Sequence, residues 1–121
     1  MIKNSNYFKD KLRYTPLFNF INDIKQKRFY KKWVANGMPS PAPYLVKHNT
    51  IKGYARMYSI STFVETGTFL GATINALKDT FSEIYSIELN EELFKYTKDK
   101  FSKCKNIEII QGDSGRVKRI S

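Results

Sequence analysis

TFVETGTFLG, residues 62–71, places a short apolar run directly before a turn that contains two glycines. Residues 62–65 predict a β-strand, and residues 66–71 predict a turn that leads straight into a helix. Gly67 allows the backbone to turn sharply and to approach a ligand where a Cβ atom would clash. Gly71 lets the helix begin close against the sheet, with its first N–H groups facing an acceptor. An ordinary strand-to-helix turn has the same pattern, so this stretch alone assigns no function.

Downstream of this stretch, helical and strand patterns alternate. Residues 72–81 predict a helix and residues 83–88 a second strand. Asn90 is a suitable N-cap for a helix that runs to about residue 103, and residues 107–110 predict a third strand. Strand, helix, strand, helix, strand in this order indicates a parallel sheet with right-handed crossovers. We therefore expect an α/β fold with three parallel strands and ligands bound at their carboxyl ends.

Acidic residues stand at the ends of the second and third predicted strands. Glu88 ends the second strand, about 20 residues after Gly67, where a carboxylate can accept hydrogen bonds from both hydroxyls of a ribose. Asp113 follows the third strand and can accept a hydrogen bond from the exocyclic amine of an adenine. A solvated carboxylate before a helix and an Asx turn are the ordinary alternatives. All three signals occur at consecutive strand ends, which favours a ligand site.

These strand ends resemble class I S-adenosylmethionine-dependent methyltransferases. Residues 64–71 resemble the first motif of that family, acidic-x-Gly-x-x-x-Gly. Residues 84–88 resemble its second strand with the ribose-binding acid, and residues 107–114 resemble its third strand with the adenine-side acid. A nicotinamide-binding Rossmann domain is a weaker match, because its G-x-G-x-x-G motif needs a glycine where this chain has Phe69.

The resemblance implies a partial Rossmann-like fold, S-adenosylmethionine as the cofactor and a role for each motif residue. Gly67 and Gly71 would line the methionine part of the cofactor, and Glu65 would help to position its amino group. Glu88 would hold the ribose and Asp113 the adenine. The sequence identifies no catalytic residue and no methyl acceptor, which could be a sugar, a small metabolite, a protein or a nucleic acid.

The family's sheet has seven strands, and this chain matches only the first three. We therefore expect a truncated methyltransferase, without full activity alone, that lacks the part which aligns the methyl acceptor. The first strand becomes an edge strand with unpaired backbone groups, so self-association through this edge is an expectation. The alternative is a non-catalytic basic binding module, for a membrane surface or nucleic acid, that retains a nucleotide-binding half-fold.

The N-terminal part of the chain has a different composition. Residues 1–50 carry ten Lys and Arg against two Asp, so most of the net charge of +10 lies there. Residues 14–34 predict one or two amphipathic helices, which end before a proline-rich linker at 36–43 where Gly37 suits a C-terminal cap. A short helix at 51–58 precedes the first strand. The predicted organisation is a basic, aromatic helical segment with its linker at 1–43 and a partial S-adenosylmethionine-binding domain at 44–121.

Residues 25–33 mix cations with aromatic side chains. Three interpretations stay open: a helix that packs its aromatic face on the α/β domain, contact with an anionic membrane surface through residues 25–33, and, less favoured, contact with nucleic acid. The methyltransferase resemblance does not explain this segment.

The composition excludes several classes of protein. The chain has 121 residues, of which 41% are hydrophobic and 26% charged, as in a globular protein. Cys104 is the only cysteine, so neither an internal disulfide nor a cysteine-cluster metal site is expected, and we interpret Cys104 as a partly buried apolar residue. The N-terminus has no secretory signal pattern, which favours the cytoplasm. His48 is the only histidine, and we interpret it as a helix-start or surface residue rather than a general base.

Overall fold

The computed structural model describes residues 16–117, apart from the side chains of Phe18 and Asn19, and divides the chain into two compact units, 1–47 and 48–121. Tyr14, where the first helix was expected to begin, lies outside the described residues. The elements in chain order are α2 (Pro16–Ala35), α3 (Tyr44–Met57), β1 (Thr62–Thr66), α4 (Ala72–Leu77), β2 (Glu83–Glu88), α5 (Glu91–Lys100) and β3 (Ile107–Gln111).

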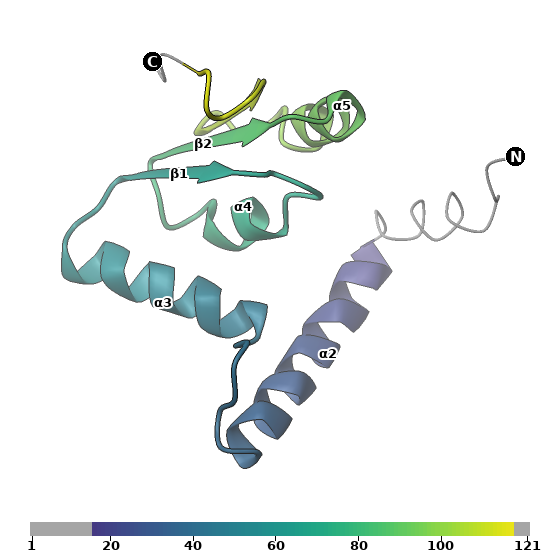
Figure 1. The fold of residues 1–121 in the computed structure, drawn as a ribbon, viewed down its shortest axis with the longest axis vertical. Helices are drawn as coiled ribbons and strands as arrows, with labels where there is room; N and C mark the ends of the chain where they lie inside the picture. Colours follow the sequence, from purple (N-terminus) through teal and green to yellow (C-terminus); the bar gives the residue numbers. More distant parts are fainter. Residues whose placement is uncertain (1–15, 118–121) are drawn as a thin grey trace, which may run out of the picture. The chain divides into compact units, whose positions relative to one another are not determined.

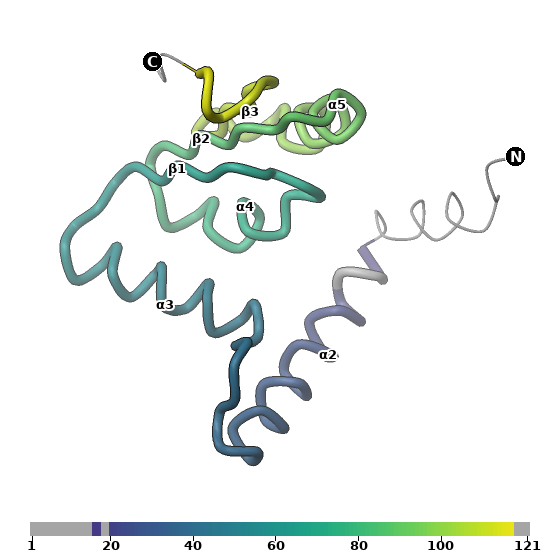
Figure 2. The backbone as a smooth tube through the Cα atoms, in the orientation of Figure 1, coloured from purple at the N-terminus to yellow at the C-terminus, as the bar shows by residue number. Residues whose placement is uncertain are grey.

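The second unit is built on a three-stranded sheet in the order β1-β2-β3, with both pairs parallel. β2 and β3 are rich in isoleucine, and β1 contains phenylalanine and valine, all of which favour extended backbone. Figure 2 lets the chain be followed from β1 through α4 to β2, and from β2 through α5 to β3. The predicted α/β fold, a three-stranded parallel sheet with flanking helices, is therefore confirmed.

The helices of this unit pack on one face of the sheet. Phe63, Ile84 and Ile107 are register partners on neighbouring strands, so their side chains point to the same face. Right-handed crossovers that advance in one direction, β1 to β2 to β3, place α4 and α5 on this same face. Figure 1 shows α4 along β1 and β2. The buried core on this face consists of Ala55, Ile74, Leu77, Phe81, Ile84, Phe101 and Ile109.

The opposite face of the sheet has less cover. Val64, in β1, is 48% exposed, and Tyr85 and Ile110 are half-buried. β1 and β3 are the edge strands. On the covered face, by contrast, the Phe63 ring packs on Phe81 with 5.3 Å between the ring centroids. On the opposite face Ile87, in the central strand, is also buried, so that face is less covered rather than bare.

Several element boundaries differ from the prediction. α3 begins at Tyr44 rather than at residue 51, because prolines are tolerated just before a helix. α4 ends at Leu77, whereas the pattern predicted a helix to residue 81. The Asn106 side chain donates hydrogen bonds to the carbonyls of Lys78 (2.8 Å) and Phe81 (3.0 Å), which satisfies these groups outside a helix. Phe81 is nevertheless buried, as predicted.

The predicted capping of α5 is confirmed. The Asn90 side chain accepts a hydrogen bond from the Leu93 N–H at 3.0 Å. Glu91 and Glu92 lie in the first turn and Lys98 in the last, which suits the helix dipole. The helix ends at Lys100, somewhat before residue 103.

The first unit is dominated by α2. Gly37 follows the helix with φ +80°, and the Met38 N–H donates to the Trp33 carbonyl at 3.0 Å, which closes the helix as expected for a glycine cap. The Trp33 indole N–H donates to the Pro39 carbonyl at 2.6 Å. The turn after the helix is thus held against its last turn.

Candidate functional site

The turn after β1 has an unusual backbone. Gly67, Phe69 and Gly71 all have positive φ, of 79°, 50° and 79°. Glycine adopts this conformation freely, but phenylalanine does so at a cost. The Gly67 N–H donates to the Ile87 carbonyl at 2.8 Å, which fixes the start of the turn against β2. The chain therefore holds a strained turn at the carboxyl end of the sheet, where functional sites often store strain.

Gly67 is exposed and has open space beside it. A Cβ atom built at this position would meet no other atom within 4 Å. Nothing in the fold of the unit therefore fills the space that the missing side chain leaves. This is the arrangement expected of a glycine that lets a ligand approach the backbone.

Gly71 has a different environment. It is buried at the start of α4, and a Cβ atom there would lie 2.5 Å from Cε2 of the Phe101 ring. The absence of a side chain lets α4 approach α5 closely, as the sequence predicted for a helix that begins against the sheet. Close packing thus accounts for this glycine without a ligand.

Glu88, at the end of β2, is only 6% exposed. One carboxylate oxygen, Oε2, accepts the Phe69 N–H at 2.9 Å, and the other, Oε1, accepts the Asn90 N–H at 2.9 Å. These charge-assisted bonds offset the cost of burying the carboxylate and connect the turn after β1 to the turn after β2. Each oxygen keeps one further lone pair for a hydroxyl donor.

Glu65 belongs to a second polar group, which crosses from β1 to β2. The buried Ser86 hydroxyl donates to Oε1 of Glu65 at 2.9 Å. The Thr68 hydroxyl lies 2.6 Å from the same Ser86 oxygen. Because the Ser86 proton is committed to the carboxylate, Thr68 is the donor in the shorter bond. The sequence reasoning missed Thr68 and Ser86; the signal was a serine in the middle of an otherwise apolar strand.

Asp113 lies beyond β3 and is exposed. Its Oδ1 atom accepts the Gly115 N–H at 2.9 Å, and its Oδ2 atom lies 3.7 Å from Nε of Arg116. The first contact is an Asx turn, which was the ordinary alternative to an adenine-binding role. The structure therefore gives both carboxylate oxygens of Asp113 local partners.

Lys100 reaches back from α5 to the same turn. Its Nζ atom donates to the Leu70 carbonyl at 3.0 Å. Burial lowers the pKa of Lys100, and the nearby charge of Lys78 lowers it further. The ammonium group thus tethers the turn after β1 to the end of α5.

His48 lies inside α3 and is half-buried, rather than at a helix start or on the surface as predicted. Its Nε2 atom lies 3.3 Å from the Thr73 hydroxyl at the start of α4. Cys104 is half-buried against the core, as predicted. Residues 16–117 contain no cluster of metal-ligating side chains. Nor does that part of the chain include a helix long and apolar enough to cross a membrane.

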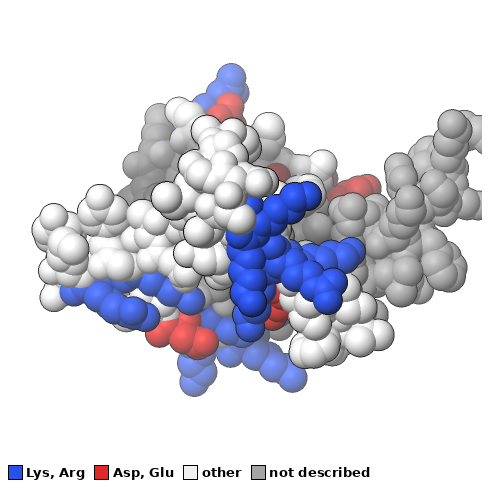
Figure 3. Space-filling model, turned by 90° about the horizontal axis from the view of Figure 1, so that it is seen from below, with Lys and Arg blue, Asp and Glu red and all other residues white. Residues whose placement is uncertain are grey.

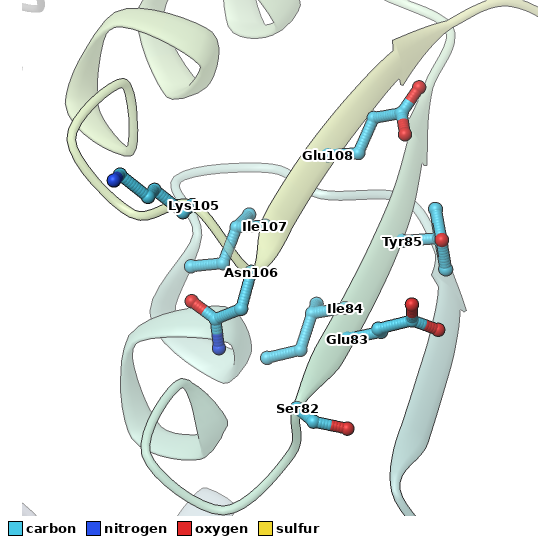
Figure 4. Close-up of a pocket in the computed structure, with 8 residues that line it drawn as sticks. All are labelled: Ser82, Glu83, Ile84, Tyr85, Lys105, Asn106, Ile107 and Glu108. Atoms are coloured by element: carbon cyan, nitrogen blue, oxygen red, sulfur yellow. The ribbon is translucent and has the colours of Figure 1, made fainter.

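A recess of about 360 Å³ lies at the other end of the sheet. It is lined by residues 82–85 and 105–108, around the amino ends of β2 and β3 (Figure 4). Figure 4 shows Ile84 and Ile107 pointing to one side of the strands, and Glu83 and Tyr85 to the other. No sequence-predicted site residue lies here. Glu65, Gly67 and Glu88 lie together at the carboxyl ends of β1 and β2, while Asp113 follows the end of β3.

No protein-family model and no curated protein sequence matches this chain. Solved structures do match it. A protein from Staphylococcus aureus assigned as a caffeoyl-CoA O-methyltransferase is 20% identical, with a TM-score of 0.51 over 78% of this chain and 50% of that one. A protein from Klebsiella pneumoniae assigned as an O-methyltransferase is 10% identical, with a TM-score of 0.53 over 78% of this chain and 48% of that one.

At this level of identity the similarity is one of fold. The chain has the fold of class I S-adenosylmethionine-dependent methyltransferases over part of their length. It spans about half the length of these two solved structures. The predicted resemblance is therefore confirmed for the fold.

Proposed function

We propose that the second unit is the cofactor-binding part of an S-adenosylmethionine-dependent methyltransferase. The observation that carries the proposal is the Glu88 carboxylate, which is buried at the end of β2 and bonded to the N–H of Phe69 in the turn that contains Gly67. A carboxylate, an open glycine and a parallel strand end together form a site for a nucleoside with a polar tail. The methyltransferase fold makes S-adenosylmethionine the favoured nucleoside.

The side chains present fit this cofactor. The remaining lone pairs of Glu88 would accept hydrogen bonds from the ribose hydroxyls. Glu65, oriented by Ser86, would accept a hydrogen bond from the amino group of the methionine part. The open space at Gly67 leaves room for the part of the cofactor that joins the ribose to this amino group. Asp113 would meet the adenine amine through Oδ2, since Oδ1 is committed to the Asx turn.

The chemistry of methyl transfer comes mainly from the cofactor, whose sulfonium activates the methyl group. The protein's contribution is to hold the cofactor and to exclude competing orientations. We assign Glu65, Gly67, Glu88 and Asp113 to binding. Gly71 shapes the site through its packing on Phe101 rather than through contact with the cofactor.

Calorimetric titration with S-adenosylhomocysteine, the demethylated product, tests the binding site. Gly67→Asn keeps a residue that tolerates positive φ but fills the open space, so we expect loss of binding. Gly37→Asn is the matched control, because Gly37 has φ +80° and equally open surroundings but lies in the first unit. Equal affinity in both variants, with native circular dichroism, would exclude this site.

A second candidate function is a non-catalytic basic binding module that keeps the cofactor-binding half-fold. The observation that favours it is the run of cations in α2, from Lys25 to Lys32, for which no ion pair is found within residues 16–117. Cofactor binding without methyl transfer to any acceptor would support this candidate.

A further inference from the structure

The apolar side chains of α2 form two groups on opposite faces of the helix. Leu17, Phe20, Ile21 and Ile24 follow the spacing i, i+3, i+4, i+7, which aligns them on one face. In the second half of the helix the apolar residues are Phe29, Tyr30, Trp33 and Val34. At 3.6 residues per turn, the two groups point about half a turn apart. The apolar face therefore changes sides between the first and second halves of α2.

The two groups differ in their contacts. In the second group, Trp33 is half-buried, its indole is bonded to the Pro39 carbonyl, and the Tyr30 ring lies 6.0 Å from it, although Phe29, Tyr30 and Val34 are exposed. In the first group, Leu17 is 66% exposed and Phe20 is 63% exposed, and the two isoleucines are exposed as well. Isolated apolar residues on a surface are normal, but an aligned group of four indicates a contact surface.

The cations of α2 lie on the same helix face as the first group, closer to the C-terminal end of the helix. Arg28 lies four residues after Ile24 and Lys31 seven residues after it, so both follow the same line along the helix. Lys25, Lys27 and Lys32 flank this line. Asp23 is the only acidic residue of α2, and its position points away from this face. One helix face is thus apolar over its first two turns and cationic over its last turns.

We propose that this face of α2 binds an anionic lipid surface. A lipid surface fits both parts, since apolar side chains enter the boundary between headgroups and acyl chains while lysine and arginine contact the phosphates. In the space-filling view of Figure 3, Lys and Arg side chains stand at the surface, with fewer Asp and Glu side chains among them. A single-stranded nucleic acid fits less well, because stacking requires aromatic rings among the cations. Here three of the four side chains in the first group, Leu17, Ile21 and Ile24, are aliphatic and offer no ring for a base to stack on.

The attachment would be peripheral and oblique. From Leu17 to Lys31 the helix is about 21 Å long, so the apolar turns and the cationic turns reach different depths. The apolar end enters the lipid and the cationic end stays at the headgroups. The sequence-based expectation was contact through residues 25–33, which include Trp33; the Trp33 indole is instead bonded to the Pro39 carbonyl within its own unit.

The test is sedimentation of the full chain with vesicles of phosphatidylcholine, with and without phosphatidylserine. We expect binding to the anionic vesicles only, and a decline with added salt as the charges are screened. Phe20→Ser and Arg28→Glu should each raise the lipid concentration for half-binding by about tenfold. Phe29→Ser, which removes an exposed aromatic ring from the other face, should leave it unchanged.

Three outcomes would overturn the proposal. The first is equal binding to neutral and anionic vesicles. The second is an equal loss of vesicle binding in Phe29→Ser and Phe20→Ser. The third is binding of single-stranded RNA that is weakened by Arg28→Glu but not by Phe20→Ser. The last result would assign the face to nucleic acid. All variants lie in the first unit, so S-adenosylhomocysteine titration of the same proteins reports separately on the proposed cofactor site.

Discussion

The two ends of the same sheet differ in how their polar groups are used. At the carboxyl ends, Glu88 is buried and bonded to two backbone N–H groups beside a strained turn. At the amino ends, Glu83 is exposed, and its carboxylate accepts a long hydrogen bond from the Thr62 hydroxyl, at 3.3 Å. Both carboxylates belong to β2, yet only one is held in place by the fold.

The amino end nevertheless holds the recess of about 360 Å³. This recess therefore lies at the opposite end of the sheet from the proposed site. Burial of a charge and backbone strain cost free energy, and a fold retains them where function requires them or where a network compensates. The comparison teaches that the ordered charge, rather than the hollow, marks the candidate site.

The largest expected effect is on stability, at Gly71. In Gly71→Ala, the new Cβ atom would lie 2.5 Å from the Phe101 ring, and the alanine backbone would have to adopt φ +79°. We expect the free energy of unfolding to fall by about 2–5 kcal/mol, the sum of overpacking and left-handed strain. Urea denaturation measures it.

The control for this variant is Gly67→Ala. Gly67 has the same φ of +79° but no atom within 4 Å of the added Cβ. It should lose only the left-handed strain, about 1–2 kcal/mol. Similar losses in the two variants would contradict the packing role that we assign to Gly71.

The next effect compares the two carboxylates of β2 directly. Glu88→Ala should weaken S-adenosylhomocysteine binding by about 1.5–3 kcal/mol, the range for hydrogen bonds to a charged group. Glu83→Ala, at the other end of the same strand, should leave the affinity unchanged. Calorimetry at a temperature where both variants are folded measures the difference. If the two variants weaken binding equally, the cofactor does not lie at the carboxyl end.

The smallest effect concerns the amino end. Asn106→Ala removes the donor that serves the Lys78 and Phe81 carbonyls. We expect a loss of about 1–2 kcal/mol in the free energy of unfolding, because these groups are partly buried, and no change in cofactor affinity. Asn106→Asp keeps the shape but cannot donate, so it should lose a similar amount. A weakened affinity in either variant would move the functional site toward the recess.

Local patterns were enough to predict much of this fold. The alternation of apolar strands with helical segments predicted all three parallel strands, and Asn90 predicted the start of α5. These features depend on residues close together in sequence. The carboxyl-end location of Glu65, Gly67 and Glu88 followed from the topology, because parallel strands end at the same edge.

The sequence could not predict features that depend on distant residues. The early end of α4 depends on Asn106, which lies about 30 residues further along the chain. The reason for Gly71 is the Phe101 ring, and the orientation of Glu65 depends on Ser86. Tertiary proximity decides each of these, and no local pattern records it.

The most direct test of the central claim is to map S-adenosylhomocysteine on the ¹⁵N-labelled protein by changes in amide chemical shift. We predict the largest changes in residues 66–71 and 88–90, with smaller ones near Asp113, and none at the amino ends of the strands. Changes confined to residues 82–85 and 105–108, or no saturable change anywhere in the protein, would contradict the claim that the carboxyl ends of this sheet bind the cofactor.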